Sequence, residues 1–267
     1  QDSGVHFAIR DKRALGMTVC NRRWAVDWKK LLSCLLGGSM LVCAVVVLPG
    51  CGRRITEEER AQAVAYVQQG VTAAESGRLD VATDLFKRAI ALDSTNAEAH
   101  YRLAMMLQYA PTPDLQEAEA EYRRAIAHDS SQVAAMFNLG QLCAQTSRYD
   151  EALSLFGKVL ERDTTTQIRS LTHFCIGMTF GIRGDADRAA RAYAEAVHSD
   201  STYARAYVGW GKELARIQRY GEAARLLEKA LALDSSLIEA HSHLATCYRG
   251  MNRMDEAAAH DRFYQQA

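Results

Sequence analysis

Residues 140–159 read GQLCAQTSRYDEALSLFGKV and contain the pattern on which the fold depends. Gly140 is followed twelve residues later by Ala152 and, four residues after that, by the aromatic residue Phe156. Gly and Ala at such positions let two helices approach closely. The acids Asp150 and Glu151 suit the first turn of a helix, where the helix dipole favours negative charge. The stretch therefore predicts two packed helices joined by a short turn.

The same pattern recurs along the chain. The equivalent alanines are spaced by 36, 34, 37, 34 and 34 residues, and a period of this length is typical of a stacked array of helical pairs. In each copy a small residue on the preceding predicted helix occupies the position equivalent to Gly140. The alanines are Ala82, Ala118, Ala152, Ala189, Ala223 and Ala257, and the small residues are Gly70, Ala104, Gly140, Gly177, Gly211 and Ala245.

This pattern resembles the tetratricopeptide repeat, a helix–turn–helix unit of about 34 residues. The resemblance implies an all-α fold, a right-handed superhelical solenoid of about six repeats, preceded by an N-terminal signal or anchor segment. The solenoid is expected over residues 63–267. Its repeats are predicted at about 63–96, 97–132, 133–166, 170–203, 204–237 and 238–267.

Three local features refine the helix boundaries. Thr56 and Glu59 have the spacing of a capping box, so the first helix is expected to begin near residue 57. Two insertions, Pro111-Thr112-Pro113 and residues 167–169, are expected in loops. Repeats end in Asp followed by Ser or Thr where the family usually has Pro, and this hydroxyl is expected to cap the next helix. The pairs are Asp93-Ser94, Asp129-Ser130, Asp163-Thr164, Asp200-Ser201 and Asp234-Ser235.

By the same resemblance, a concave groove is formed mainly by the first helix of each pair. Its side chains come from the second, fifth, sixth, ninth, twelfth and thirteenth positions of a repeat. They form an aromatic and Met-lined strip bordered by cations, as a peptide-binding groove requires. The alternative is that Phe137 and Phe174 pack between neighbouring helices. The predicted groove residues are Tyr101, Arg102, Met105, Phe137, Asn138, Gln141, Phe174, Met178, Arg205 and Lys212.

The segment before the repeats has the features of an export signal. Residues 31–48 carry no charge and follow the cations Arg22, Arg23, Lys29 and Lys30, which is the arrangement of a segment that enters a membrane. The sequence Leu48-Pro49-Gly50-Cys51 then resembles the lipobox of bacterial lipoproteins. The resemblance implies cleavage before Cys51 and a lipid on its thiol, so residues 1–50 are the signal region and residues 51–62 a short linker.

Two alternatives remain open for this segment. Residues 31–48 are close to the length that spans a bilayer, so an uncleaved transmembrane anchor in the inner membrane is the alternative to a lipoprotein. The chain begins with Gln1, and a start at Met17 would leave residues 1–16 outside the native protein. Both anchors place the repeats in the bacterial cell envelope. Gly52 after the cysteine favours the outer membrane, with the repeats facing the periplasm.

The composition and the motifs of the sequence limit the kinds of site that this protein is expected to have. Lys plus Arg and Asp plus Glu both number 32, so a general nucleic-acid binder is not expected. Cys143, Cys175 and Cys247 form no C-x-x-C pair, and Cys143 and Cys247 are predicted to be buried. His241 and His243 are two residues apart and would face different sides of a helix, so no metal site is predicted. No catalytic motif and no cofactor site is expected.

The sequence therefore predicts a non-enzymatic, membrane-anchored scaffold that binds a segment of another protein. Lipoproteins with repeats of this kind resemble the pilotins that help type IV pilus secretins assemble, and more broadly the lipoproteins of outer-membrane protein assembly. The alternative is a non-catalytic accessory subunit or regulator of an envelope enzyme, such as peptidoglycan-processing machinery. Partner, pathway and oligomeric state do not follow from the sequence.

Overall fold

Each repeated sequence unit folds into a pair of α-helices. The computed structural model describes residues 55–163 and 165–266, and this part of the chain contains twelve helices and no strand. The first helices of the pairs are α2 (Glu57–Glu75), α4 (Ala97–Gln108), α6 (Val133–Gln145), α8 (Thr166–Arg183), α10 (Ala204–Arg216) and α12 (Ile238–Gly250). The second helices are α3 (Leu79–Leu92), α5 (Leu115–His128), α7 (Tyr149–Arg162), α9 (Ala186–Ser199), α11 (Tyr220–Leu233) and α13 (Met254–Gln266).

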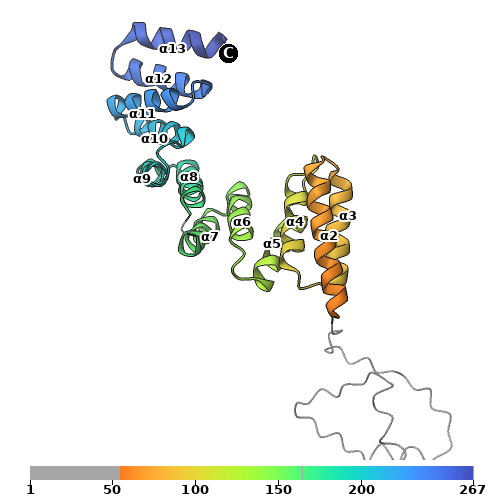
Figure 1. The fold of residues 1–267 in the computed structure, drawn as a ribbon. Helices are drawn as coiled ribbons and strands as arrows, with labels where there is room; N and C mark the ends of the chain where they lie inside the picture. The colour runs from red at the N-terminus through yellow and green to blue at the C-terminus, as the bar shows by residue number, and fades with distance from the viewer. Residues whose placement is uncertain (1–54, 164, 267) are drawn as a thin grey trace, which may run out of the picture. The chain divides into compact units, whose positions relative to one another are not determined.

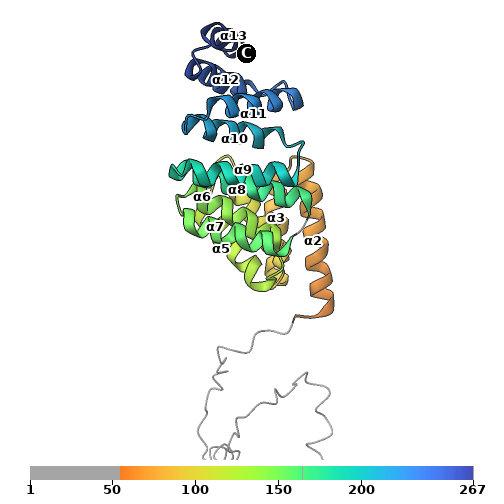
Figure 2. The same ribbon diagram turned by 90° about the vertical axis from the view of Figure 1, so that its left-hand side faces the viewer.

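The pairs stack in chain order. Each second helix contacts the first helix of the next pair, and first helices of adjacent pairs also touch, as for α8 and α10. Figures 1 and 2 show this succession from α2 to α13. A stacked array buries a continuous core that no pair could bury alone. The all-α solenoid of six helical pairs is confirmed.

Small residues on the first helices contact aromatic rings on the second helices. A Cβ atom built on Gly140 would lie 2.7 Å from a ring carbon of Phe156, and one on Gly70 would lie 2.5 Å from Phe86. The rings of Phe86 and Phe156 are completely buried. The recurring pairing of a small residue with an aromatic residue is therefore a contact within the first, third and fourth helical pairs, and in the fifth pair Leu227 takes the place of the ring against Gly211.

The first helix begins where the sequence predicts. Thr56 is the N-cap of α2, and its side-chain oxygen accepts a hydrogen bond from the Glu59 backbone N–H at 3.1 Å. The Glu59 carboxylate accepts one from the Thr56 backbone N–H at 3.0 Å. The capping box is confirmed, and it satisfies two backbone donors that a helix start would otherwise leave unpaired.

The connection between repeats corrects one prediction. At the four described positions, Ser94, Ser130, Ser201 and Ser235, the Ser after the repeat-ending Asp does not cap the next helix, because the N-caps lie further on, at residues such as Asn96 and Gln132. Instead, the Asp carboxylate accepts a hydrogen bond from the backbone N–H two residues later. The bonds join Asp93 to Thr95, Asp129 to Ser131, Asp163 to Thr165, Asp200 to Thr202 and Asp234 to Ser236, at 2.8 to 3.0 Å. These Asx turns are an alternative to the fixed φ of Pro.

These turns predict a loss of stability in acid. Hydrogen bonds from a hydroxyl and a backbone N–H hold the pKa values of Asp129, Asp200 and Asp234 below the usual Asp range. A carboxyl whose pKa is lower in the folded state stabilises the fold above its unfolded pKa of about 3.9, and this contribution is lost as the pH falls further. We expect the melting temperature to drop on acidification, and to drop less when all three are replaced by Asn. An unchanged acid profile in the triple variant would contradict this.

Both insertions are predicted to lie in loops, and the structure confirms this for one of them only. Pro111-Thr112-Pro113 lies in the loop between α4 and α5, as predicted. The prediction for residues 167–169 is wrong, because these residues belong to α8, which begins at Thr166 rather than near residue 170. No Pro or Gly interrupts this stretch, so the extra residues lengthen the helix.

The burial of the cysteines agrees with the prediction from the sequence, whereas the predicted membrane anchor lies outside the described residues. Cys143 and Cys247 are buried as predicted, and Cys175 is buried as well. Between residues 55 and 266, no helix has both the length and the apolar character needed to cross a bilayer. The signal region 1–50 and Cys51 lie outside the described residues.

Candidate partner-binding groove

The first helices of the pairs form one surface, which we call the groove face. Three hollows lie along it, between α2 and α4, between α6 and α8, and between α8 and α10. Each hollow is bordered by residues at the positions that the repeat resemblance assigns to the groove. The repeat periodicity therefore brings these side chains to one face because each first helix presents the same turn of its surface.

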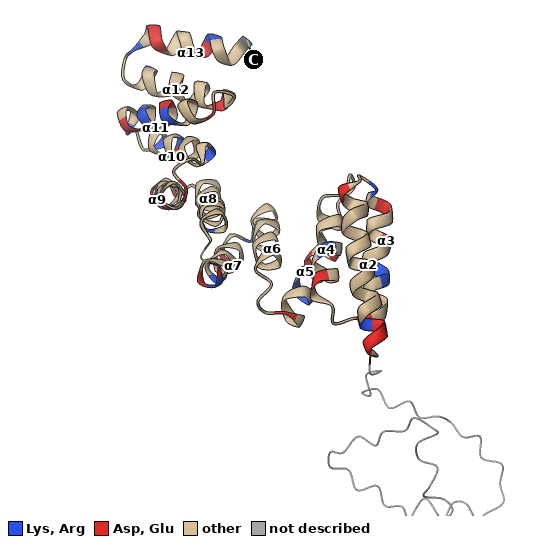
Figure 3. Cartoon of the chain, viewed as in Figure 1, with Lys and Arg blue, Asp and Glu red and all other residues tan. Residues whose placement is uncertain are grey.

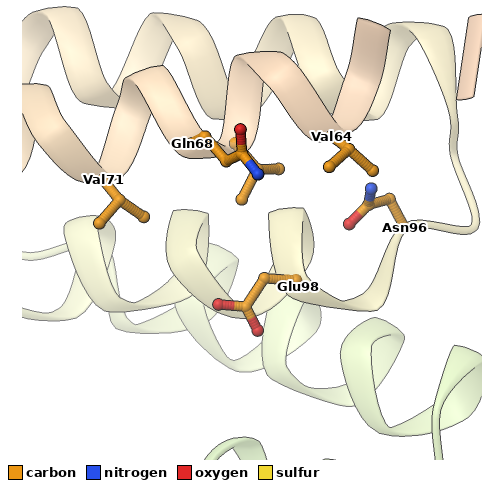
Figure 4. Close-up of a pocket in the computed structure, with 6 residues that line it drawn as sticks. Val64, Gln68, Val71, Asn96 and Glu98 are labelled. Carbon is orange, nitrogen blue, oxygen red and sulfur yellow. The ribbon is translucent and has the colours of Figure 1, made fainter. Parts of the chain in front are cut away.

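The hollow between α2 and α4 has a volume of about 420 Å³. Figure 4 shows Val64, Gln68 and Val71 of α2 facing Asn96 and Glu98 at the start of α4. Val67 completes the lining. Apolar walls with a few polar groups at one side are typical of a site that takes up a side chain of a bound segment.

Hydrogen bonds fix the polar side of this hollow. The Asn96 side chain caps α4 by accepting from the Ala99 backbone N–H at 2.9 Å. The Glu98 carboxylate accepts from Arg102 Nε at 2.6 Å and from Gln132 Nε2 at 2.9 Å. Because Gln132 precedes α6, these bonds link the second repeat to the third and hold Glu98 in place.

The middle of the groove face contains four of the predicted residues. Tyr101, Arg102, Met105 and Asn138 are all half-buried on α4 and α6. The Arg102 guanidinium lies 5.5 Å from the centre of the Tyr101 ring. Burial raises the pKa of Tyr101, so this hydroxyl stays protonated and can donate a hydrogen bond.

Two predicted aromatic residues pack against other aromatic rings. Phe137 is only 8% exposed and packs 5.8 Å, centre to centre, from the ring of Phe156. Phe174 is half-buried between Tyr193 at 5.6 Å and Tyr203 at 5.2 Å. Both rings thus pack between helices, as the alternative interpretation predicts; Phe137 offers little surface to a ligand, whereas Phe174 stays partly exposed.

Gln141 and Met178 border the hollow between α6 and α8, which measures about 200 Å³. Phe156 and Cys175 also line it, and Gln141 Nε2 lies 3.7 Å from Cys175 Sγ. Burial raises the pKa of the Cys175 thiol to about 11, so the thiol is neutral near pH 7 and unsuited to nucleophilic chemistry.

Charge on the groove face is uneven. The helix α6 has no charged residue, and Figure 3 shows it without blue or red segments. Arg205 and Lys212 are exposed on α10, the first helix of the repeat that follows α8. The groove face therefore changes from apolar to basic along the chain.

Several residues that line the hollows are absent from the predicted groove, and four of them show why. Val64, Gln68 and Val71 line the first hollow, and Ile182 lines both hollows beside α8. They occupy the second, sixth, ninth and thirteenth repeat positions, so applying the groove positions to the first repeat and to the end of the fourth would have found them. Among the described residues, no group of three His, Cys, Asp or Glu side chains could hold a metal ion.

Comparisons with known proteins agree with this geometry. Two family models described as tetratricopeptide repeat match residues 114–165 and 214–260. These two stretches are similar to tetratricopeptide repeats, and the series of helical pairs has the solenoid fold of such repeats.

Among proteins of known role, the chain is similar to type IV pilus assembly factors. It is 32% identical over 102 residues to the type IV pilus assembly protein PilF of Pseudomonas aeruginosa, a match covering 38% of each chain. It is 29% identical over 108 residues to the human protein O-mannosyl-transferase TMTC2, covering 40% of this chain and 13% of that one. The matches thus span well under two thirds of these relatives.

Solved structures show the same fold over more of the chain. The structure of Pseudomonas aeruginosa PilF has a TM-score of 0.67 at 20% identity, covering 79% of this chain and 96% of that one. The structure of PilW, a type IV pilus biogenesis factor, has a TM-score of 0.68 at 16% identity, covering 76% and 92%. The chain therefore has the same helical-repeat fold as these pilus factors.

Proposed function

We propose that this protein is a non-enzymatic lipoprotein of the bacterial cell envelope that binds a segment of a type IV pilus component, such as the secretin, in its groove. The observation that carries the proposal is the apolar hollow between α2 and α4, whose lining residues occupy the groove positions of the first repeat. The similarity to PilF and PilW supports the pilus pathway. A role as accessory subunit of an envelope enzyme is the second candidate.

The hollow suits a segment with protruding aliphatic side chains. Val64, Val67 and Val71 supply its apolar lining, while Gln68 and Glu98 offer hydrogen-bonding groups at its edge. Burying one aliphatic side chain contributes about 1.5–3 kcal/mol. A segment that places such side chains in successive hollows would therefore be held with a defined register.

The groove is tested by Val64→Asp in the full-length protein in its native cells. Val64 is 44% exposed, so the substitution places a charge in the hollow without removing a core residue. We expect crosslinking to the secretin and pilus assembly to fall by about tenfold or more, because a bound apolar side chain would desolvate the carboxylate. Val81→Asp is the control, since Val81 is 46% exposed and lies on α3, outside this hollow.

Equal loss in both variants would show a general effect of charge and contradict the groove assignment. Co-purification of the wild-type protein with a peptidoglycan enzyme instead of a pilus component, with a change in that enzyme's rate, would favour the accessory-subunit role. Turnover of a substrate by the purified protein alone would contradict a scaffold without catalytic activity.

The anchor is tested by Cys51→Ser. Because the thiol would carry the lipid, we expect the variant to move from the membrane fraction to the soluble fraction of the envelope, and the N-terminal peptide of the wild-type protein to be acylated. Stable membrane anchoring needs more than one acyl chain. In a lipoprotein these chains are attached at the one modified cysteine, so its substitution removes the whole anchor. An unmodified Cys51 with residues 17–50 intact in the wild-type protein would indicate a transmembrane anchor instead.

A further inference from the structure

The groove face has a second region, centred on α8, where apolar and basic surfaces meet. Met178 is 43% exposed and Ile182 is 62% exposed, although both are large apolar side chains. On the neighbouring helix α10, Lys212 and Arg216 are exposed about one turn apart on the same side of the helix. Isolated exposed apolar residues need no explanation, but a pair beside cations has the composition of an interaction surface.

Met178 and Ile182 form a ridge between two hollows. The hollow of about 200 Å³ lies on the α6 side of this ridge, where Gln141, Ala144 and Gln145 face it. A hollow of about 150 Å³ lies on the α10 side, lined by Gly181, Tyr193, Lys212 and Glu213 as well as the ridge. An aliphatic side chain of a ligand can therefore lie against the ridge while a group three or four residues away reaches α10.

The cations of α10 differ in how far they are neutralised. Arg216 Nη1 donates to Glu213 Oε2 at 2.6 Å and to the Gly181 carbonyl oxygen at 3.2 Å, so its guanidinium is fixed beside the hollow. Glu213 is almost completely buried and compensates this one cation. Among the described residues, no carboxylate oxygen lies within 4.0 Å of the Lys212 ammonium. One positive charge therefore remains uncompensated at the hollow.

The titratable groups around Lys212 do not remove the positive charge of its ammonium group from the hollow. His243 on α12 faces Lys212, and burial together with this cation lowers the pKa of His243, which is therefore mainly neutral near pH 7. Glu239 on α12 also lies near His243, and Arg205 lies near Asp234. Asp234 thus lies near Arg205 at the start of α10, and Glu239 and Glu213 near His243, whereas Lys212 lines the hollow beside the ridge and Arg216 bonds the Gly181 carbonyl in its wall.

We infer that α6, α8 and α10 bind a partner segment in which an aliphatic side chain lies within about four residues of an Asp or Glu side chain. The aliphatic group contacts Met178 and Ile182, and the carboxylate pairs with Lys212 and the free edge of Arg216. The inference rests on the proposed partner-binding function and adds the chemistry of the segment and its direction, with the acid toward α10. Charge complementarity of this kind gives specificity and a fixed register.

The experiment selects peptides of about 12 residues from a random display library on the full-length protein and measures their affinities with a fluorescent label. We expect the enriched peptides to combine an aliphatic residue with a nearby acid. Their affinity should fall by about tenfold in Lys212→Glu and about fivefold in Ile182→Asn, and should weaken as salt is raised. Both side chains are exposed, so these variants keep the core intact.

Matched controls separate this site from general effects. Lys229→Glu makes the same charge change on an exposed residue of α11, and Ile238→Asn makes the same apolar change on α12. Both should change the affinity by less than about twofold. The inference is overturned if no peptide is enriched, if the enriched peptides lack acids, or if Lys212→Glu binds them as well as the wild type does.

One outcome overturns only this inference. Peptides that lose affinity in Val64→Asp but not in Lys212→Glu would place binding at the hollow between α2 and α4, which supports the proposed function and contradicts the second region. Self-association that disappears in Lys212→Glu would show that a second copy of the chain covers this face instead.

Discussion

Phe156→Ala is expected to lower the free energy of unfolding by about 3–5 kcal/mol, the usual cost of removing a buried ring. The Phe156 ring is fully buried, lies against Gly140 of its own repeat and packs 5.8 Å from the ring of Phe137. It also forms part of the floor of the hollow between α6 and α8. Its removal leaves a cavity in the third repeat that the rigid glycine contact cannot close.

Chemical denaturation of the full-length protein measures this loss. The third repeat lies in the middle of the array, so its weakening is expected to affect repeats on both sides, since each repeat is stabilised by its neighbours. Phe263→Ala is the control, because Phe263 is 61% exposed on α13 and its removal should cost less than about 1 kcal/mol. A loss of similar size in both variants would contradict the role assigned to the Gly140–Phe156 contact.

His100→Ala is expected to cost about 3–5 kcal/mol, because it leaves a buried carboxylate without one of its partners. Both His100 and Glu121 are buried between α4 and α5, and His100 Nδ1 hydrogen-bonds Glu121 Oε2. His100 Nε2 lies 3.1 Å from the Ser94 carbonyl oxygen, so the ring also ties α4 to the preceding turn. Arg124 pairs with the second oxygen of Glu121, but it cannot replace the bond that His100 makes.

A double-mutant cycle checks this account. Glu121→Ala alone should also destabilise the protein, whereas the double variant should lose clearly less than the sum of the two single losses, since each substitution removes the same contact. His198→Ala, at an exposed histidine of α9, should change the free energy of unfolding by less than about 1 kcal/mol. Additive losses would show that the two side chains stabilise the fold independently.

The repeat positions that the family resemblance assigns to the groove differ in how far their side chains are buried. The fifth position of the repeat is Val67 in the first repeat, Phe137 in the third and Val208 in the fifth, and all three are buried. The second, ninth and thirteenth positions include Val64, Met178 and Ile182, which are exposed. The fifth position is thus mostly buried, although Val67 borders a hollow and Tyr101 is half-buried, whereas the other positions carry more exposed side chains.

The helical pairs and their number can be predicted from the sequence alone. The repeated spacing of Gly140, Ala152 and Phe156 encodes a contact made within one repeat, between residues close in the chain, so a local pattern is enough to predict it. The capping box of Thr56 and Glu59 is equally local, because both partners lie within one helical turn. The basic character of α10 could also be predicted, since exposed charges need no particular packing.

Which groove positions are open depends on the tertiary structure. Phe137 is buried against the ring of Phe156, and Phe174 is half-buried between Tyr193 and Tyr203, whereas Met178 stays exposed on α8. The buried His100–Glu121 pair is likewise brought together by the packing of α4 on α5. Sequence periodicity assigns a side chain to a face, but contacts with neighbouring helices determine whether that side chain is buried or free to bind a partner.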